Sequence, residues 1–128
     1  MDKSLVQLTA SEVVEGLKKG EISPLELISA AETRILETEP AINALPTLCF
    51  ERARAHAKAL MEKEQHGSEN SRGWLAGLPV AIKDLTDVAG VRTTYGSSIF
   101  KDHIPKTSHP LVTVSYTHLR AHETAMYR

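Results

Sequence analysis

The sequence predicts an α/β domain, in which helices precede and separate short strands. Two amphipathic segments near the N-terminus carry helix-capping patterns, and two later runs are short, apolar and bounded by turn-forming residues. The order helix, helix, strand, helix, strand is typical of that class. With 128 residues, 41% hydrophobic and 24% charged, the chain can form one modest domain with a real core.

The first predicted helix begins after Thr9 and stops at Gly20. Thr9 and Glu12 match a capping box, in which a hydroxyl and a carboxylate each satisfy a free backbone N–H. Glycine is a natural helix stop because it adopts the left-handed conformation without strain. The apolar residues Val13, Val14 and Leu17 then share one helical face.

The second predicted helix repeats the same pattern. Ser23 is the expected cap, Pro24 occupies the first helical position, Glu26 completes the box and Pro40 is expected to end the helix. We interpret both helices as packing elements.

The middle of the chain predicts a strand, a helix and a loop. Residues Ile42 to Cys49 fit a short strand that Pro46 weakens. Residues 51–64 are rich in Ala, Leu, Glu and Lys, which favours a helix, and His56 within it is interpreted as a surface histidine. Residues 65–74 are polar and predict a surface loop.

The stretch LPVAIKD, Leu78 to Asp84, predicts a strand buried on both faces, because it is short, apolar and flanked by glycine. Residues 88–100 predict a loop that leads into a short helix near Ser97. Residues 105–112 turn toward another helix that we do not expect to develop.

Composition excludes several kinds of function. Fifteen Lys and Arg against sixteen Asp and Glu leave a net charge of -1, which argues against a basic nucleic-acid-binding surface. Cys49 is the only cysteine, so no internal disulfide can form, which fits a reducing cytoplasmic setting. No secretory signal and no apolar stretch of membrane-spanning length is present in the sequence.

Lys83 is the candidate functional residue, because it ends the predicted buried strand and precedes a glycine-bearing loop. Sites in α/β sheets are built on loops that follow the carboxyl ends of strands. Apolar surroundings favour the neutral form of a lysine amine, which can accept a proton. The alternative is a solvated lysine at the end of a strand.

The stretch LAGLPVAIKDLTDVAGVRTTYGSSIF resembles the first conserved block of the amidase signature family. The resemblance runs from about Leu8 to about Val112 and includes the capped helices. The positions that carry it are Gly77, Pro79, Lys83, Asp84, Gly90, Thr94, Gly96 and Ser97.

The resemblance implies an amide-bond hydrolase with a mixed sheet covered by helices. In that family the lysine matching Lys83 works with two serines, one the nucleophile and one a proton relay in a cis peptide. It implies a small-molecule amide substrate, a cytoplasmic enzyme of bacterial type, and neither metal nor organic cofactor.

Only Lys83 carries over as catalytic, and Thr94, Gly96 and Ser97 match positions that look structural. Ser97 and Ser98 are not expected to be nucleophiles, because the family takes both serines from a later Gly-Gly-Ser-Ser-Gly-Gly-type stretch. This sequence contains no such stretch.

The family pattern ends near Thr113. VSYTHLRAHET, residues 114–124, matches one reading frame of a transposon-end adapter used for sequencing libraries. We therefore divide the chain into residues 1–113, an N-terminal portion of an amidase signature domain, and residues 114–128, a non-native tail. Taken as protein, His118 and His122 have a helical i, i+4 spacing that can chelate a metal, but a third ligand is not evident.

The sequence leaves two other functions open. One is the A subunit of a glutamine-dependent tRNA amidotransferase, although residues 84–97 lack the Asp-Asn pair associated with that subunit. The other is a non-enzymatic helical interaction module. Because both serines are missing, the 128-residue chain is expected to be inactive. The amide substrate and the formation of a homo-oligomer are not determined by the sequence.

Overall fold

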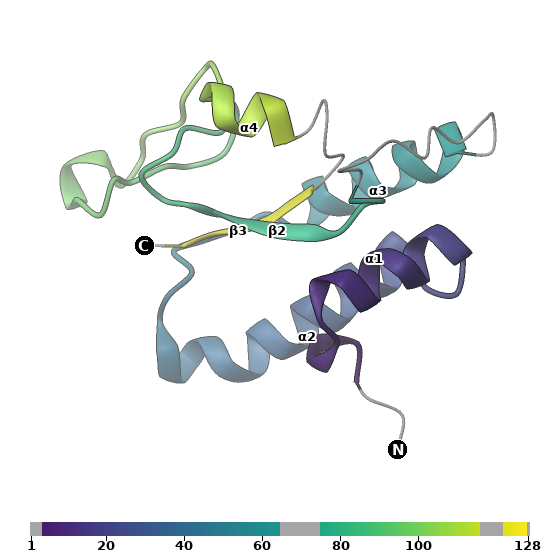
Figure 1. Ribbon diagram of the computed structural model, residues 1–128. Coiled ribbons are helices and arrows are strands. Elements are labelled where there is room, and N and C mark those ends of the chain that lie inside the picture. The colour runs from purple at the N-terminus through teal and green to yellow at the C-terminus, as the bar shows by residue number, and fades with distance from the viewer. Residues whose placement is uncertain (1–3, 65–74, 116–121, 128) are drawn as a thin grey trace.

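Helices and short strands alternate along the chain, which confirms the predicted α/β class. The computed structural model describes residues 4–64, 75–115 and 122–127. Figure 1 shows α1 and α2 on one side of the strands and α4 on the other. The elements are η1 (Leu5–Gln7), α1 (Ala10–Lys19), α2 (Pro24–Ile42), β1 (Thr47–Leu48), α3 (Phe50–Glu64), β2 (Pro79–Lys83), η2 (Ser98–Phe100), α4 (Pro110–Val114) and β3 (His122–Tyr127).

Both predicted capping boxes are present. The backbone N–H of Thr9 donates to Glu12 Oε2 at 2.7 Å, and the N–H of Glu12 donates to Thr9 Oγ1 at 3.3 Å. Ser23 and Glu26 make the same reciprocal pair at 2.8 and 3.2 Å. Gly20 closes α1 with a φ of 71°, as a left-handed helix stop.

Helix α2 extends beyond Pro40, so the predicted end of this helix was wrong. Pro40 lies inside the last turn, and the helix ends at Asn43, whose φ is 50°. Pro40 has no N–H to donate to the Leu36 carbonyl, so the helix loses one backbone hydrogen bond there, yet it keeps helical geometry through Ile42. The end is closed instead by the Asn43 N–H, which donates to the Glu39 carbonyl at 2.7 Å.

The strands form a mixed three-stranded sheet in the order β1-β3-β2. Strand β3 runs parallel to β2 and antiparallel to β1. The predicted strand Ile42 to Cys49 was too long, because Ile42 belongs to α2 and only Thr47–Leu48 pair. The strand predicted within Leu78 to Asp84 is confirmed as β2.

Strand β2 is not buried on both faces, which corrects the prediction. Val80 and Ile82 are half-buried, whereas the alternate residues Ala81 and Lys83 are exposed. Ile82 packs against a buried valine cluster, and the described elements leave the Ala81 side uncovered. The continuous apolar run therefore predicted the strand correctly, but it wrongly predicted that other elements cover both faces of that strand.

The core consists of two clusters of buried side chains. Ile28 from α2 packs against Phe50, Ala53 and Ala57 from α3. The second cluster joins the loop after β2 to α4 through Val88, Val91 and Val112. The first cluster ties the long helices together, and the second fixes the segment that follows Lys83.

Two expectations, about a histidine of α3 and about the C-terminal part, need correction. His56 is half-buried, not a fully exposed surface residue, and burial together with the Arg52 charge lowers its pKa below the ordinary value. Helix α4 does form over Pro110–Val114, where none was expected, with the His109 ring accepting from the Leu111 N–H at 3.2 Å.

The segment interpreted as adapter-derived contains a strand. His122 begins β3, so it does not lie on a helix as the metal-chelating spacing required. His118 lies outside the described residues, as does the predicted surface loop 65–74. The interpretation of residues 114–128 concerns their origin and stays a prediction.

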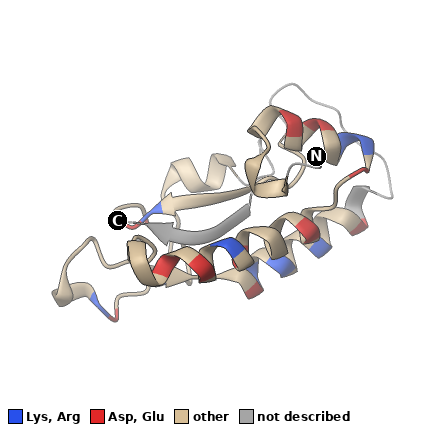
Figure 2. Cartoon of the chain, turned by 90° about the horizontal axis from the view of Figure 1, so that it is seen from below, with Lys and Arg blue, Asp and Glu red and all other residues tan. Residues whose placement is uncertain are grey.

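Charges of both signs alternate along the helices (Figure 2). This mixture gives the chain no single-signed face in that view, in keeping with its net charge of -1. Among the helices of the described segments, none has both the length and the apolar character needed to cross a membrane.

Candidate active site

Lys83 is the last residue of β2, and its side chain is exposed. Its carbonyl accepts a hydrogen bond from the Thr86 N–H at 2.8 Å, so a turn begins at the lysine itself. The sequence placed Lys83 in apolar surroundings, and the described residues do not provide them. Strand alternation explains this, because Lys83 shares the uncovered face of β2 with Ala81.

Asp84 lies on the opposite side of the chain from Lys83 and is completely buried. Its Oδ1 accepts from the Thr94 N–H at 2.7 Å, and its Oδ2 accepts from the Thr94 hydroxyl. Its carbonyl accepts from the Tyr95 N–H at 3.0 Å. Asp84 therefore holds the loop that contains Thr94 and Tyr95 through both carboxylate oxygens and its backbone carbonyl.

The loop held by Asp84 has an unusual backbone. Tyr95 and Gly96 have φ values of 51° and 68°, consecutive positions in the left-handed region. Such a conformation is costly for a tyrosine and ordinary for a glycine. The turn is closed by the Ser97 N–H, which donates to the Thr94 carbonyl at 2.9 Å. The backbone of this loop is therefore held in one conformation at the end of the strand that carries Lys83.

The Tyr95 ring leads to a second polar cluster. Its hydroxyl donates to Asp87, and it lies 3.4 Å from His103 Nε2. The hydrogen bond to Asp87 raises the pKa of Tyr95, because ionising the phenol would place two negative charges side by side. The Phe100 ring meets Tyr95 edge-on with centroids 5.1 Å apart.

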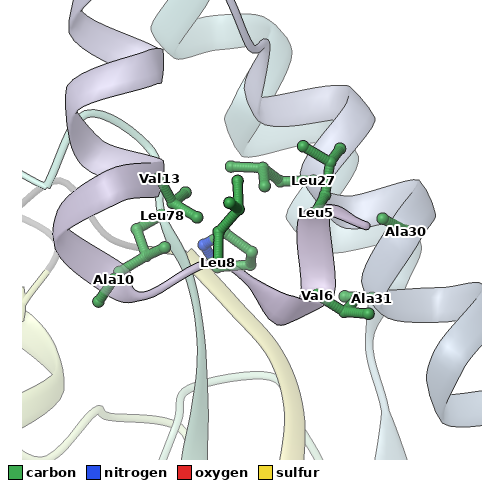
Figure 3. A pocket seen from close by; sticks show the side chains of 10 residues that line it. Leu5, Val6, Leu8, Ala10, Val13, Leu27, Ala30, Ala31 and Leu78 are labelled. Atoms are coloured by element: carbon green, nitrogen blue, oxygen red, sulfur yellow. The ribbon is translucent and has the colours of Figure 1, made fainter. Parts of the chain in front are cut away.

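Of the cavities in the described part of the chain, two lie near β2. The first, of about 300 Å³, is apolar and lies between η1, α1, α2 and the start of β2 (Figure 3). Its lining side chains, among them Leu5, Val13, Leu27 and Leu78, offer no group for acid–base chemistry. We assign it to packing between helices.

The second cavity, of about 440 Å³, is more polar and borders the loop after β2. Thr94, Gly96 and Ser97 line it together with Arg92 and Lys101, and Lys83 does not. Both Arg92 Nη atoms donate to backbone carbonyls, those of Lys101 and Pro46. The guanidinium therefore ties two segments together at this cavity.

Ser97 and Ser98, the two serines that follow the loop, differ in their surroundings. Ser97 caps η2, its hydroxyl accepting from the Ile99 N–H at 3.3 Å. Ser98 is exposed on the rim of the second cavity. Within the described residues, no group of three or more His, Cys, Asp or Glu side chains is placed to hold a metal ion.

Sequence reasoning found Lys83, Thr94 and Gly96 but assigned Asp84 no role. Strand alternation could have indicated its role. If Lys83 points outward, the adjacent Asp84 points inward. A buried carboxylate needs hydrogen-bond donors, so a donor elsewhere in the chain was to be expected. The hydroxyl and N–H of Thr94, ten residues later, supply them.

A mixed sheet with helices on both sides, and a lysine at the end of a strand, define an α/β domain with one candidate active site at that strand end. The family model described as Amidase matches residues 26–116. The chain belongs to the amidase signature family.

Curated relatives include A subunits of glutamyl-tRNA(Gln) amidotransferase. That of Carboxydothermus hydrogenoformans (strain ATCC BAA-161 / DSM 6008 / Z-2901) is 42% identical over 101 residues, which cover 79% of this chain and 20% of that protein. That of Roseiflexus sp. (strain RS-1) is 39% identical with the same coverage. This chain thus spans about a fifth of the length of the curated relatives it matches.

Solved structures confirm the fold. A bacterial aryl acylamidase of the amidase signature family has a TM-score of 0.81 and 25% identity, over 94% of this chain and 25% of that one. A protein from a vestigial complex related to the origins of an s-triazine catabolic enzyme has a TM-score of 0.83 and 30% identity, over 94% and 26%. Fatty acid amide hydrolase, at 19% identity and a TM-score of 0.78, is similar in fold alone.

Proposed function

We propose that residues 1–113 derive from an amide-bond hydrolase, called the parent enzyme below, and that Lys83 is its general base. The observation that carries the proposal is the position of Lys83, at the carboxyl end of β2 on the exposed face, next to Asp84, which is hydrogen-bonded to the Thr94–Gly96 loop. Membership of the amidase signature family supports the same chemistry.

The proposed reaction follows the family mechanism of a serine nucleophile, a relay serine and a lysine. The neutral Lys83 amine takes a proton through the relay serine, and the nucleophilic serine attacks the amide carbonyl. The protonated lysine returns this proton through the relay serine to the departing nitrogen, so that ammonia or an amine leaves, and water then hydrolyses the acyl-enzyme to the acid and the free serine. Backbone N–H groups of a glycine-rich segment stabilise the oxyanion.

The exposure of Lys83 is compatible with this function if other segments of the parent enzyme cover the open face of β2. A fully hydrated lysine amine is protonated at neutral pH and is a poor base, whereas removal of water favours its neutral form. The side chains of Ala81 and Lys83 already point to that face. We propose that the serine-bearing segments lie there.

The 128-residue chain is proposed to be inactive by itself. It carries the base, and its sequence contains no stretch of the serine-bearing type. The test is ammonia release from a simple amide by the purified chain and by its Lys83→Ala variant, with equal background rates expected. Hydrolysis above the Lys83→Ala rate would overturn this proposal.

We also propose that residues 114–128 are not part of the parent enzyme, because VSYTHLRAHET matches adapter sequence over eleven residues. Amplifying the locus from source DNA tests this directly. We expect the family pattern to continue after Thr113 toward a Gly/Ser-rich loop. Recovering the same codons for residues 114–124 would refute the adapter origin.

A second candidate function is the amidotransferase A subunit. It is favoured by the curated relatives, which are 39% and 42% identical to this chain over 101 residues. The absence of the Asp-Asn pair in residues 84–97 favours a general amidase instead. Comparing ammonia release from glutamine and from simple amides by the parent enzyme separates the two. Activity restricted to glutamine, with partner-subunit genes beside the locus, would select the amidotransferase.

A further inference from the structure

Asp84 is a buried carboxylate that forms no ion pair with any lysine, arginine or histidine in the described part of the chain. Burying a carboxylate is costly unless hydrogen bonds compensate for the lost water. Here the compensation comes from one residue, Thr94, whose N–H and hydroxyl each donate to a different carboxylate oxygen.

The Thr94 hydroxyl also connects Asp84 to the glycine of the loop. It donates to Asp84 Oδ2 and accepts from the Gly96 N–H at 3.3 Å. The main chain makes a parallel link, from the Tyr95 N–H to the Asp84 carbonyl at 3.0 Å. The loop is therefore joined directly to the strand end at Thr94 and Tyr95, and Gly96 is linked to it through the Thr94 hydroxyl.

On the other side, Asp84 fixes the lysine. The two residues are adjacent, so burial of Asp84 directs Lys83 to the exposed face. The lysine carbonyl is held by the turn to Thr86. Among the described residues the Lys83 side chain has no partner of its own, so its direction depends on the main chain that Asp84 anchors.

We propose that Asp84, acting with Thr94, is the positioning residue of the lysine site: it holds Lys83 and the Tyr95–Gly96 loop in one fixed arrangement. This inference rests on the proposed function of Lys83. It does not make Asp84 a proton carrier, because its oxygens are occupied by Thr94 and face away from Lys83.

The first test uses the 128-residue chain and amide hydrogen exchange measured by NMR. The Thr94 and Tyr95 N–H groups should exchange slowly, and Thr94→Val should speed the exchange of Tyr95 and Gly96. Thr94→Ser, which keeps the hydroxyl, should leave it slow. Fast exchange in the unmodified chain, or amide signals without the dispersion of a folded protein, would overturn the arrangement.

The second test uses the parent enzyme and measures amide hydrolysis against pH. Asp84→Asn and Thr94→Val should each lower kcat by about 10- to 100-fold with KM within about threefold, because a misplaced base costs rate more than binding. Thr94→Ser should restore kcat. Thr33→Val, the same change at an exposed position on α2, is the matched control and should leave kcat unchanged.

The Lys83→Ala background separates the inference from the proposed function. If Asp84 acts through Lys83, Asp84→Asn has little further effect on the residual rate once the lysine is gone. Equal losses with and without Lys83, or a loss of thermal stability with unchanged kcat, would overturn the positioning role. If Lys83→Ala alone leaves hydrolysis intact, the proposed function fails instead.

Discussion

Gly77, two residues before β2, offers a quantitative test of how the strand carrying Lys83 is seated. Its φ is 89°, and a Cβ added there would lie 2.9 Å from Leu60 Cδ2 and 2.9 Å from Pro24 Cγ. Carbon atoms in contact prefer about 3.5–4.0 Å, so both neighbours would have to move. The Leu60 methyl can turn away, whereas the Pro24 ring at the start of α2 is rigid.

Gly20 provides the matched control, because its φ is 71° and a Cβ there meets nothing within 4 Å. An alanine in the left-handed region costs about 1–2 kcal/mol at either position. Overpacking adds about 1–3 kcal/mol, and only at Gly77. We therefore expect Gly20→Ala to lower the free energy of unfolding by about 1–2 kcal/mol and Gly77→Ala by about 2–5 kcal/mol.

Urea denaturation followed by far-ultraviolet circular dichroism measures both values in the 128-residue chain. The dependence of the unfolding free energy on urea should stay the same in the two variants, so that midpoints can be compared directly. Equal losses for Gly77→Ala and Gly20→Ala would refute the packing of Gly77 between α2 and α3.

Three further predictions concern single side chains. Ser23→Ala should lower the free energy of unfolding by about 1 kcal/mol through loss of the α2 cap. Ser29→Ala, at an exposed position inside the same helix, should leave that free energy unchanged or raise it slightly, because alanine has the higher helix propensity; equal losses for the two variants would contradict the cap. Burial lowers the pKa of His56, so below pH 6.5 the unfolded chain binds more protons at this residue than the folded chain, and the free energy of unfolding should fall as the pH drops. His56→Gln should make that fall smaller, and an unchanged pH dependence in the variant would contradict the lowered pKa. Because Asp87 raises the pKa of Tyr95, Asp87→Asn should move the Tyr95 phenol absorbance titration to lower pH, and no movement would argue against that hydrogen bond.

Local signals in the sequence predicted the helices well. Thr9 with Glu12, and Ser23 with Glu26, place a hydroxyl and a carboxylate at a spacing that only a helix start uses efficiently. The end of α2 was mispredicted because Pro40 is a strong signal whose cost depends on where in the helix it falls. A helix cap depends on residues only a few positions apart, so a short stretch of sequence is enough to predict it.

Burial was predicted less well, because it depends on what covers each face. The run LPVAIKD is apolar throughout and suggested two covered faces, yet Ala81 and Lys83 are exposed. The partner strand β3 comes from residues 122–127, which no pattern in the sequence assigned to a sheet. Such pairings are long-range, and sequence periodicity does not specify them.

At the candidate site, the sequence identified Lys83 and the glycine loop but not the residue that joins them. Asp84 and Thr94 are ten positions apart, and neither stands out by type. Their relationship appears only when β2 and the loop are placed side by side. The missing information was tertiary contact, which explains why a buried acid next to the lysine was overlooked.

The most direct test of the account is the rate of amide hydrolysis by the parent enzyme with and without the Lys83 amine. Lys83→Ala should lower kcat by about a thousandfold or more, because a weak hydroxyl nucleophile needs its base. Lys58→Ala, which removes an exposed lysine from α3, should leave kcat unchanged. Equal rates for Lys83→Ala and Lys58→Ala would contradict the central claim that Lys83 is the base.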